Sequence, residues 1–310
     1  MKLIVPKYYA DFKCVGGSCS DNCCIGWEID IDEDTARLYS SIEGDIGTAL
    51  RENISTQGDC THFVLREGDR CPFLTDRNLC RIINELGEDH LCHICAQHPR
   101  FHNQLPDRIE SGLGMCCEEA ARLILTHSSP TTLITEDEPC GEDEIIALRD
   151  RVILILQDRS LDIKERVTNA LNLCGTNLTS RTTSQWIDLF ISLERLDEKW
   201  TEILELVRRK HTCADTNGFD IYIKERQTEY EQLLVYLIYR HMANAPTLED
   251  ACPRVALAAL CYEIIYTAAA VLWTENGSFD TEQQIELCRM LSSEIEYSDE
   301  NLYILLDNLY

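Results

Sequence analysis

Positive charge is scarce in this chain of 310 residues. Its 28 lysines and arginines stand against 54 aspartates and glutamates, which gives a formal net charge of −26. Proteins that bind nucleic acid need a cationic surface to displace counterions from the phosphates, and the triplet Arg208-Arg209-Lys210 is isolated. We therefore predict no nucleic-acid partner. The acidic surface keeps the protein soluble, and it also favours a basic or lysine-bearing protein partner.

Long apolar runs are missing too. We find no stretch of the ~20 apolar residues that a membrane-spanning helix needs. The chain starts with a short apolar run that Pro6 and Lys7 interrupt, which makes it too short for a secretory signal. These absences predict a cytoplasmic protein without membrane insertion.

Motifs for nucleotide binding and nucleophilic catalysis are also absent. The run Gly112-Leu113-Gly114 lacks the preceding strand and the third glycine of a dinucleotide-binding loop. The sequence contains neither a P-loop nor a nucleophile elbow. It therefore identifies no catalytic residue and no residue that binds an organic cofactor.

Cysteine, in contrast, is abundant. The chain has 17 cysteines, and eleven of them lie between Cys14 and Cys117. A small secreted protein would use such residues for disulfides. This chain is 45% hydrophobic and long enough to build a core without them. In a reducing cytoplasm the pattern favours a metal site, with a disulfide-rich redox protein as an alternative.

The clustered cysteines fall into four groups. These are Cys14, Cys19, Cys23 and Cys24; Cys71 and Cys80; Cys92 and Cys95; and Cys116 and Cys117. Thiolates suit zinc, copper(I) and iron–sulfur clusters, and four of them complete a tetrahedral zinc site or a cubane cluster. Neighbouring residues point in different directions on a helix or a strand, so Cys23 and Cys24 are not expected to bind the same metal atom.

The spacing alone leaves the metal open. No pair of CxxC motifs forms a zinc ribbon. The CxxxCxxC motif of radical enzymes is missing. After Cys19 and Cys23 it requires a cysteine at position 26, where this chain has Gly26. This argues against a radical mechanism. The histidines nearby are predicted to be exposed or hydrogen-bonded rather than ligands: His90, His93, His98 and His102.

Periodicity predicts a mainly α fold, in which a small cysteine-rich, metal-organised N-terminal α+β region is followed by an all-α helical domain. We expect domains at residues 1–129 and 142–310, joined by an acidic linker at 130–141. In the first domain we expect strands at 26–31, 61–65, 70–74 and 79–82, and helices at 35–50, 89–97 and 116–127. In the second we expect helices at 142–158, 161–174, 184–208, 219–243, 251–274 and 280–296.

Six short runs resemble one known family when they are taken together. They are Phe12-Lys13-Cys14-x4-Cys19-x3-Cys23-Cys24-x-Gly26-Trp27, Cys71-Pro72-Phe73-Leu74, Leu79-Cys80-Arg81-Ile82, Leu86-Gly87-Glu88, Cys95-x2-His98-Pro99-Arg100 and Cys116-x2-Glu119-Ala120-Ala121-Arg122. This set resembles the flagellin lysine-N-methylase family, part of a wider group of zinc- or iron-chelating proteins with clustered cysteines. The match covers roughly the first 125 residues. The remainder is similar only in its helical character.

The resemblance implies an enzyme that transfers methyl groups from S-adenosylmethionine to lysine ε-amines of flagellin. It also implies an iron–sulfur cluster of the 4Fe-4S type, with zinc as the alternative metal. Four of the matching cysteines would hold the cluster, and the resemblance does not say which four. The matching cysteines are Cys14, Cys19, Cys23, Cys24, Cys71, Cys80, Cys95 and Cys116. Whether the metal is catalytic or structural stays open at this point.

A lysine nucleophile must lose its proton before it attacks a methyl group, so a methylase needs a proton acceptor or a desolvated lysine. Tyr8, Tyr9, Glu88 and Glu119 lie in or beside the cysteine-rich region, although capping, ion pairing or packing explains each of them more simply. A competing hypothesis needs no methyl donor. It describes a non-enzymatic zinc- or iron-binding module that interacts with a protein partner.

Overall fold

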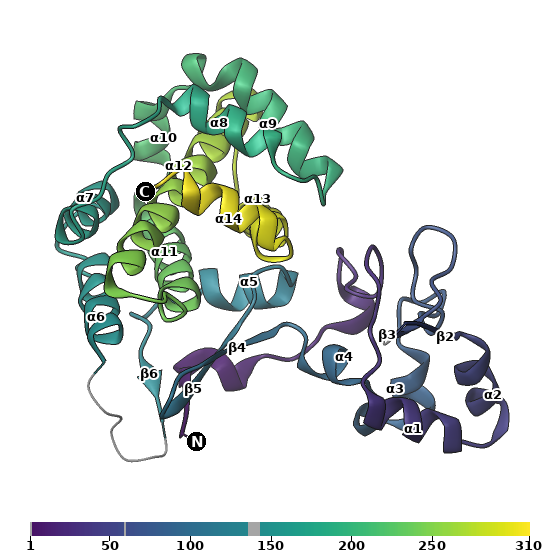
Figure 1. The fold of residues 1–310 in the computed structure, drawn as a ribbon. Helices are drawn as coiled ribbons and strands as arrows, with labels where there is room; N and C mark the ends of the chain where they lie inside the picture. Colours follow the sequence, from purple (N-terminus) through teal and green to yellow (C-terminus); the bar gives the residue numbers. More distant parts are fainter. Residues whose placement is uncertain (1, 59, 136–142) are drawn as a thin grey trace. The chain divides into compact units, whose positions relative to one another are not determined.

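Residues 13–100 form one structural unit, and residues 1–12 together with 101–310 form another. The computed structural model describes residues 2–58, 60–135 and 143–310 (Figure 1). We call residues 13–100 the cysteine unit and the other residues the helical unit. In sequence, the cysteine unit is therefore an insertion into the helical unit.

A small sheet in the helical unit explains this insertion. Its strand order is β4-β5-β1-β6. The strands are β1 (Lys2–Pro6), β4 (Arg100–Gln104), β5 (Arg108–Leu113) and β6 (Leu133–Ile134). β1 and β5 pair in parallel, with Lys2 opposite Arg108. Parallel neighbours need a long crossover connection, and here that connection contains the whole cysteine unit. The sequence predicted neither β4 nor β5.

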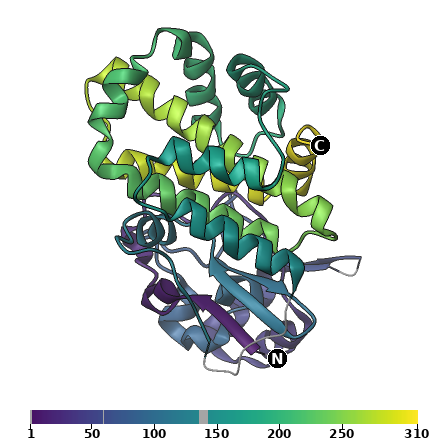
Figure 2. The same ribbon diagram turned by 90° about the vertical axis from the view of Figure 1, so that its left-hand side faces the viewer.

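Helices make up most of the helical unit (Figure 2). They are α5 (Glu118–Leu125), α6 (Glu144–Leu156), α7 (Ile163–Leu173), α8 (Thr183–Ser192), α9 (Glu198–Lys210), α10 (Thr216–Tyr222), α11 (Gln227–Met242), α12 (Leu248–Asn276), α13 (Thr281–Glu296) and α14 (Asp299–Asp307). Capping boxes at Asp162, Thr182 and Asp280 fix the starts of α7, α8 and α13. The predicted mainly α class is confirmed.

Two of the predicted helices were wrong in their length. The helix predicted over 184–208 is α8 followed by α9, and the helix predicted over 219–243 is α10 followed by α11. The apolar spacing continues across both breaks, so periodicity alone could not reveal them. After the first break, α9 begins at its N-cap residue Asp197, whose side chain accepts a 2.8 Å hydrogen bond from the backbone N–H of Lys199. α14 was not predicted.

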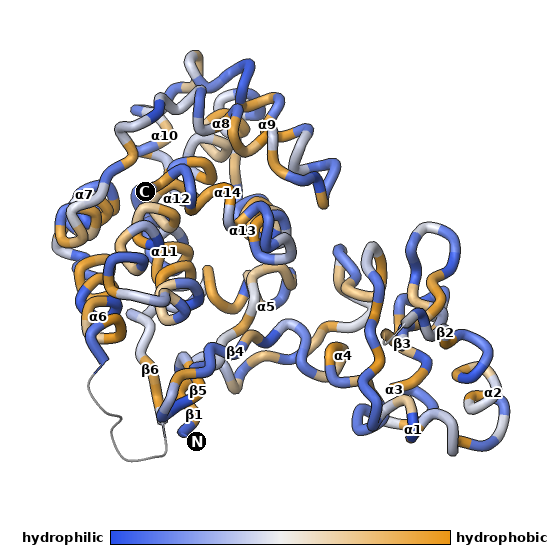
Figure 3. Tube along the Cα trace, in the orientation of Figure 1, coloured by the Kyte–Doolittle hydropathy of each residue, from blue (hydrophilic) through white to orange (hydrophobic). Residues whose placement is uncertain are grey.

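Helix α12 is the main core helix of the helical unit. By length and composition it is apolar enough to cross a bilayer, which the sequence-based prediction did not recognise (Figure 3). However, 83% of its most apolar window is buried inside the protein. It packs against α11, α7, α9 and α13. Its apolar character therefore serves the core.

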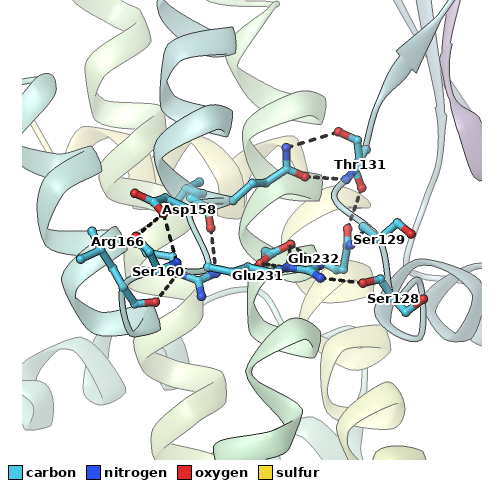
Figure 4. A network of polar contacts seen from close by, with 12 residues as sticks. Ser128, Ser129, Thr131, Asp158, Ser160, Arg166, Glu231 and Gln232 are labelled. Atoms are coloured by element: carbon cyan, nitrogen blue, oxygen red, sulfur yellow. Dashed lines mark hydrogen bonds and ion pairs between the residues drawn. The ribbon is translucent and has the colours of Figure 1, made fainter.

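A buried polar network ties the loop after α5 and the turn between α6 and α7 to α11 (Figure 4). The fully buried carboxylate of Glu231 accepts a hydrogen bond from Arg166 at 2.7 Å and another from Arg159 at 2.8 Å. Its neighbour Gln232 donates to the carbonyl of Ser129 at 2.9 Å. Two guanidinium groups thus compensate one buried carboxylate.

The units differ in their bounds from the predicted domains. Residues 101–129, which contain β5 and α5, belong to the helical unit rather than to the cysteine unit. The predicted linker at 130–141 contributes β6 at its start. Its acidic part, from 136 onward, lies outside the described residues.

The cysteine unit has its own elements and its own core. It contains α1 (Glu33–Ser41), α2 (Gly44–Glu52), β2 (Ile54–Gln57), β3 (Cys60–Phe63), α3 (Arg81–Leu86) and α4 (His93–Gln97). β2 and β3 form an antiparallel hairpin. Buried aromatic rings fill the core, with Phe63 lying 6.1 Å from Tyr39 and 5.1 Å from Phe73 between ring centroids.

Several predictions for this unit need correction. The helix predicted over 35–50 is broken into α1 and α2, because the chain turns at Gly44, whose φ of +79° favours glycine. Residues 26–31 form only an isolated bridge at Asp30 instead of a strand. The strands predicted at 70–74 and 79–82 are reduced to bridges, including one between Leu74 and Cys80, before α3 begins. The strand predicted near 61–65 is confirmed as β3.

Candidate functional site

Six cysteines gather around the core of the cysteine unit. Cys71 and Cys92 are buried in that core, while Cys24, Cys80 and Cys95 pack against it. Cys23 adjoins Cys24, and their side chains form a hydrogen bond. We call these six residues the thiol cluster: Cys23, Cys24, Cys71, Cys80, Cys92 and Cys95.

Local backbone pairing brings the first members of the thiol cluster together. The N–H of Cys71 donates to the carbonyl of Cys24 at 2.8 Å, and the bridge between Ile25 and Arg70 extends this contact. A second bridge, between Leu74 and Cys80, folds the chain back on itself. Three thiols that lie far apart in sequence thus reach the same core.

Helix α4 contributes two more thiols. Cys92 is its N-cap residue and Cys95 lies in its first turn. The two side chains form a hydrogen bond with each other. The carboxylate of Asp32, which caps α1, also accepts a 2.8 Å hydrogen bond from the N–H of His93. This bond holds the start of α4 against α1.

The thiols act on one another electrostatically. The pKa of Cys24 is raised by its hydrogen bond to Cys23, by burial and by the negative charge that Cys71 and Cys80 would carry. The pKa of Cys95 is raised in the same way, by its hydrogen bond to Cys92 and by burial. Burial raises the pKa of Cys71 to about 11. Without a compensating cation these groups stay protonated; a bound metal reverses the balance because it favours thiolates.

The donor set fits a thiolate-bound metal group in its chemistry. None of the sixteen cysteines in the described part of the chain forms a disulfide. As they stand, however, no three histidine, cysteine, aspartate or glutamate side chains among the described residues are grouped closely enough to hold a metal ion. The thiol cluster thus brings soft sulfur ligands to one core, but the described side chains are not grouped around a metal position.

The remaining predicted ligands lie elsewhere. Cys14 is exposed, and its sulfur accepts a 3.4 Å hydrogen bond from the N–H of Gly16. The thiol of Cys19 donates to the carbonyl of Asp21 at 2.8 Å. Cys116 belongs to the helical unit. Of the eight predicted ligands, five are members of the thiol cluster: Cys23, Cys24, Cys71, Cys80 and Cys95.

Cys92 was not among the predicted ligands, although it is only 1% exposed and lies within the thiol cluster. Its relation to Cys95, a CxxC spacing at the start of a helix, was the sequence signal that could have identified it. Cys23 and Cys24 lie in a turn rather than in a helix or strand, and their side chains hydrogen-bond; that they do not bind the same metal atom stays a prediction.

Cys116 lies beside a buried charged group in the helical unit. Its sulfur is 2.8 Å from the hydroxyl of Tyr297. The neighbouring Glu296 is fully buried and pairs with Arg240 at 3.2 Å and with His241 at 3.0 Å. Burial would raise the pKa of Glu296, but Arg240 and His241 hold it below its usual value. Because these residues lie far apart in sequence, sequence patterns did not reveal this group.

The proposed proton acceptors have structural roles. Burial raises the pKa of Tyr8 above its usual value. Tyr9 packs against the core of the helical unit. Glu119 lies 3.4 Å from Arg122, and Glu88 begins a 3₁₀ turn before α4. Tyr9 thus packs and Glu119 forms an ion pair, and the structural explanation favoured for all four side chains stays a prediction.

Of the histidines near the cysteines, His93 and His102 are exposed, and His90 and His98 are half-buried. Nδ1 of His102 lies 2.6 Å from the hydroxyl of Ser111. Burial lowers the pKa of His98 to about 4, with help from Arg100. Nδ1 of His90 is buried and has no hydrogen-bond partner among the described residues. His98 is therefore neutral at physiological pH.

A family model and several known proteins each match part of the chain. A family model described as the FliB lysine N-methylase C-terminal domain matches residues 176–310. The flagellar biosynthetic protein FliU of Salmonella muenchen is 32% identical over 126 residues, which are 39% of this chain and 75% of that protein. Lysine-N-methylases of Salmonella choleraesuis and Salmonella typhimurium are each 30% identical over 128 residues. No solved structure matches the chain.

The aligned segment spans 39% of this chain but only 31% of each lysine-N-methylase. It nevertheless covers three quarters of the FliU protein at a similar identity. The family model adds a match over most of the helices in the second half of the chain. The chain therefore belongs to the flagellin lysine-N-methylase family, a family of protein-lysine methyltransferases.

Proposed function

We propose that this protein works in the cytoplasm, where it transfers methyl groups from S-adenosylmethionine to lysine ε-amines of flagellin. We further propose that its cysteine unit holds an iron–sulfur cluster. The observation that carries this proposal is the thiol cluster, six cysteines from separate segments around one core, in a chain of the lysine-N-methylase family.

Two observations support flagellin as the substrate. One relative is named a flagellar biosynthetic protein. The chain itself carries a formal net charge of −26, which attracts a protein that presents lysines. A lysine substrate approaches as an ammonium ion, so the acidic surface favours its encounter before the proton is lost.

The thiol cluster offers more ligands than one centre needs. A cubane cluster takes four thiolates, and Cys71, Cys80 and Cys92 are the ligands we favour, completed by one of the other members. When bound, a fully thiolate-ligated cluster supplies cross-links among the segments of the cysteine unit. This favours a structural role. Zinc would use the same ligands, and metal analysis of protein purified without oxygen distinguishes the two metals.

Co-expression with flagellin tests the activity. Peptide mass spectrometry of the flagellin is expected to show methylated lysines with the wild-type protein and none with Cys92→Ser. Cys213→Ser is the matched control, because Cys213 is exposed and lies in the helical unit. Unmodified flagellin in the presence of folded, metal-loaded protein would rule out this function.

The second candidate is a metal-binding interaction module without activity, which the absence of a nucleotide-binding motif favours. Calorimetry with S-adenosylmethionine separates the two candidates. Methyl transfer requires binding of the donor by protein purified without oxygen, whereas an interaction module shows no heat of binding.

A further inference from the structure

A cavity of about 280 Å³ lies among α7, α8 and α12 of the helical unit, and none of the residues discussed above as metal ligands lines it. This volume is near the lower end of the range for small-molecule sites. Apolar side chains of Val167, Leu171 and Leu260 line part of it, and Lys164, Arg181 and Glu263 supply charge. A cavity with an apolar lining and a few polar groups is typical of ligand sites.

The cavity contains a cation that retains unused donors. The guanidinium of Arg181 lies over the ring of Trp186, 5.4 Å from its centroid. Its Nη2 also hydrogen-bonds to Asn308. A guanidinium has five N–H donors in a planar fork that matches a carboxylate. Lys164 contrasts with it, since its ammonium already pairs with Asp220 at 2.7 Å.

The cavity also contains a carboxylate and a hydroxyl without hydrogen-bond partners. In the part of the chain that the structure describes, no hydrogen bond or close ion pair engages Glu263. The surrounding protein desolvates this group and raises its pKa, although Lys164 acts in the opposite direction and the residue keeps an exposed surface. The hydroxyl of Tyr262 is buried and has no partner among the described residues.

An available cation and an unpaired carboxylate on the wall of one cavity are complementary to a zwitterion. We propose that this cavity binds the amino-acid end of the methyl donor, with its α-carboxylate on Arg181 and its α-ammonium on Glu263. The methylene chain would then lie against the apolar lining. This inference rests on the proposed methyl transfer from S-adenosylmethionine.

Calorimetry on the full-length protein tests the site with S-adenosylhomocysteine, which carries the same amino-acid end. We expect Glu263→Gln and Arg181→Met each to weaken binding roughly tenfold or more, because each removes a charge-assisted contact. The matched controls are Glu202→Gln and Arg209→Met, which change exposed residues outside the cavity. Their affinity should equal that of the wild type.

Competition identifies the end of the ligand that is bound. L-methionine should displace S-adenosylhomocysteine, whereas adenosine should not. Displacement by adenosine alone would overturn the assignment. Equal affinity of wild type, Glu263→Gln and Arg181→Met would also overturn it, while the proposed function would stand.

A folded wild-type protein that binds neither S-adenosylmethionine nor S-adenosylhomocysteine would refute the proposed function itself, and the cavity assignment with it. Thermal denaturation of each variant establishes that the protein is folded. Arg181→Met could unfold the protein, since Arg181 also contacts Asn308 and Trp186. In that case Glu263→Gln alone tests the assignment.

Discussion

Individual cysteines in this chain have very different surroundings. Cys71 and Cys92 are buried within an apolar core, whereas Cys14 and Cys213 are exposed. A buried thiol without a metal behaves as a small hydrophobic residue, and a metal converts it into a ligand. The effect of replacing a cysteine therefore depends on which of these surroundings it occupies.

The replacement Cys71→Ser should release the metal and unfold the cysteine unit. Binding of a structural metal contributes about 10 kcal/mol or more in small domains, which is comparable to the whole stability of a domain. Iron and zinc content, together with circular dichroism, measures the effect. Cys213→Ser should retain metal and fold. Full metal content in Cys71→Ser would contradict a role for this thiol.

Breaks between helices depend on partners that are distant in sequence. The turn between α8 and α9 is fixed by Glu294 of α13, whose carboxylate accepts hydrogen bonds from the N–H groups of Leu196 at 3.1 Å and Asp197 at 3.2 Å. Asn301 of α14 accepts a third from Glu194 at 2.7 Å. These bonds satisfy N–H groups of the turn that precedes α9. Periodicity along 184–208 carries no information about them, which explains why one helix was predicted.

Glu294 should make stability depend on pH. Burial, with a contribution from Asp197, raises its pKa to about 7. A folded-state pKa above the unfolded value means that the folded protein binds more protons, so stability falls as the pH rises from about 4.5 through 7. Glu294→Gln keeps an acceptor and removes the charge.

Urea unfolding at pH 5 and pH 8 measures this effect. The variant should gain about 1–2 kcal/mol relative to the wild type at pH 8 and little at pH 5. Glu202→Gln, at an exposed position on α9, serves as the control. A gain that is the same at both pH values would show that Glu294 does not titrate in this range.

The link between α11 and the turn after α6 should be sensitive to one substitution. Glu231→Gln leaves the guanidinium of Arg166 buried without its counter-charge. Loss of one partner of a buried ion pair costs about 3–5 kcal/mol. Urea unfolding should show this loss, and Glu225→Gln, at an exposed position, should be neutral. A loss under 1 kcal/mol would show that the buried guanidinium of Arg166 does not depend on the charge of Glu231.

At the scale of the whole molecule, two cores coexist in one chain. The core of the helical unit is far larger than that of the cysteine unit. A small core supports little stability without an added cross-link. The proposed metal should therefore matter more to residues 13–100 than to the helices.

Chelation of the metal should produce two thermal transitions. The transition of the cysteine unit should move to lower temperature, and the transition of the helical unit should stay in place. Calorimetry records both, and the tryptophans separate them, because Trp27 lies in the cysteine unit and Trp200 in the helical unit. A single transition that chelators do not shift would argue against a structural metal.

The sequence predicted features that short-range patterns determine. Helical periodicity gave the mainly α class, and cysteine grouping gave five members of the thiol cluster. Features that depend on distant partners were missed: the β1–β5 pairing, the buried Glu296 group and the cavity around Arg181. Cys92 was missed for a different reason, since a CxxC spacing on its own occurs in many settings.

The insertion of the cysteine unit between β1 and β5 has a consequence for synthesis. Lys2 pairs with Arg108, so the first strand leaves the ribosome about a hundred residues before its partner. At bacterial elongation rates of roughly 5–20 residues per second, this delay lasts on the order of 5–20 s. The cysteine unit is complete before β5 exists. We therefore expect the proposed metal to enter on the nascent chain, and we expect cells short of iron or zinc to release chains in which the inserted unit is unfolded while β1 still pairs with β5.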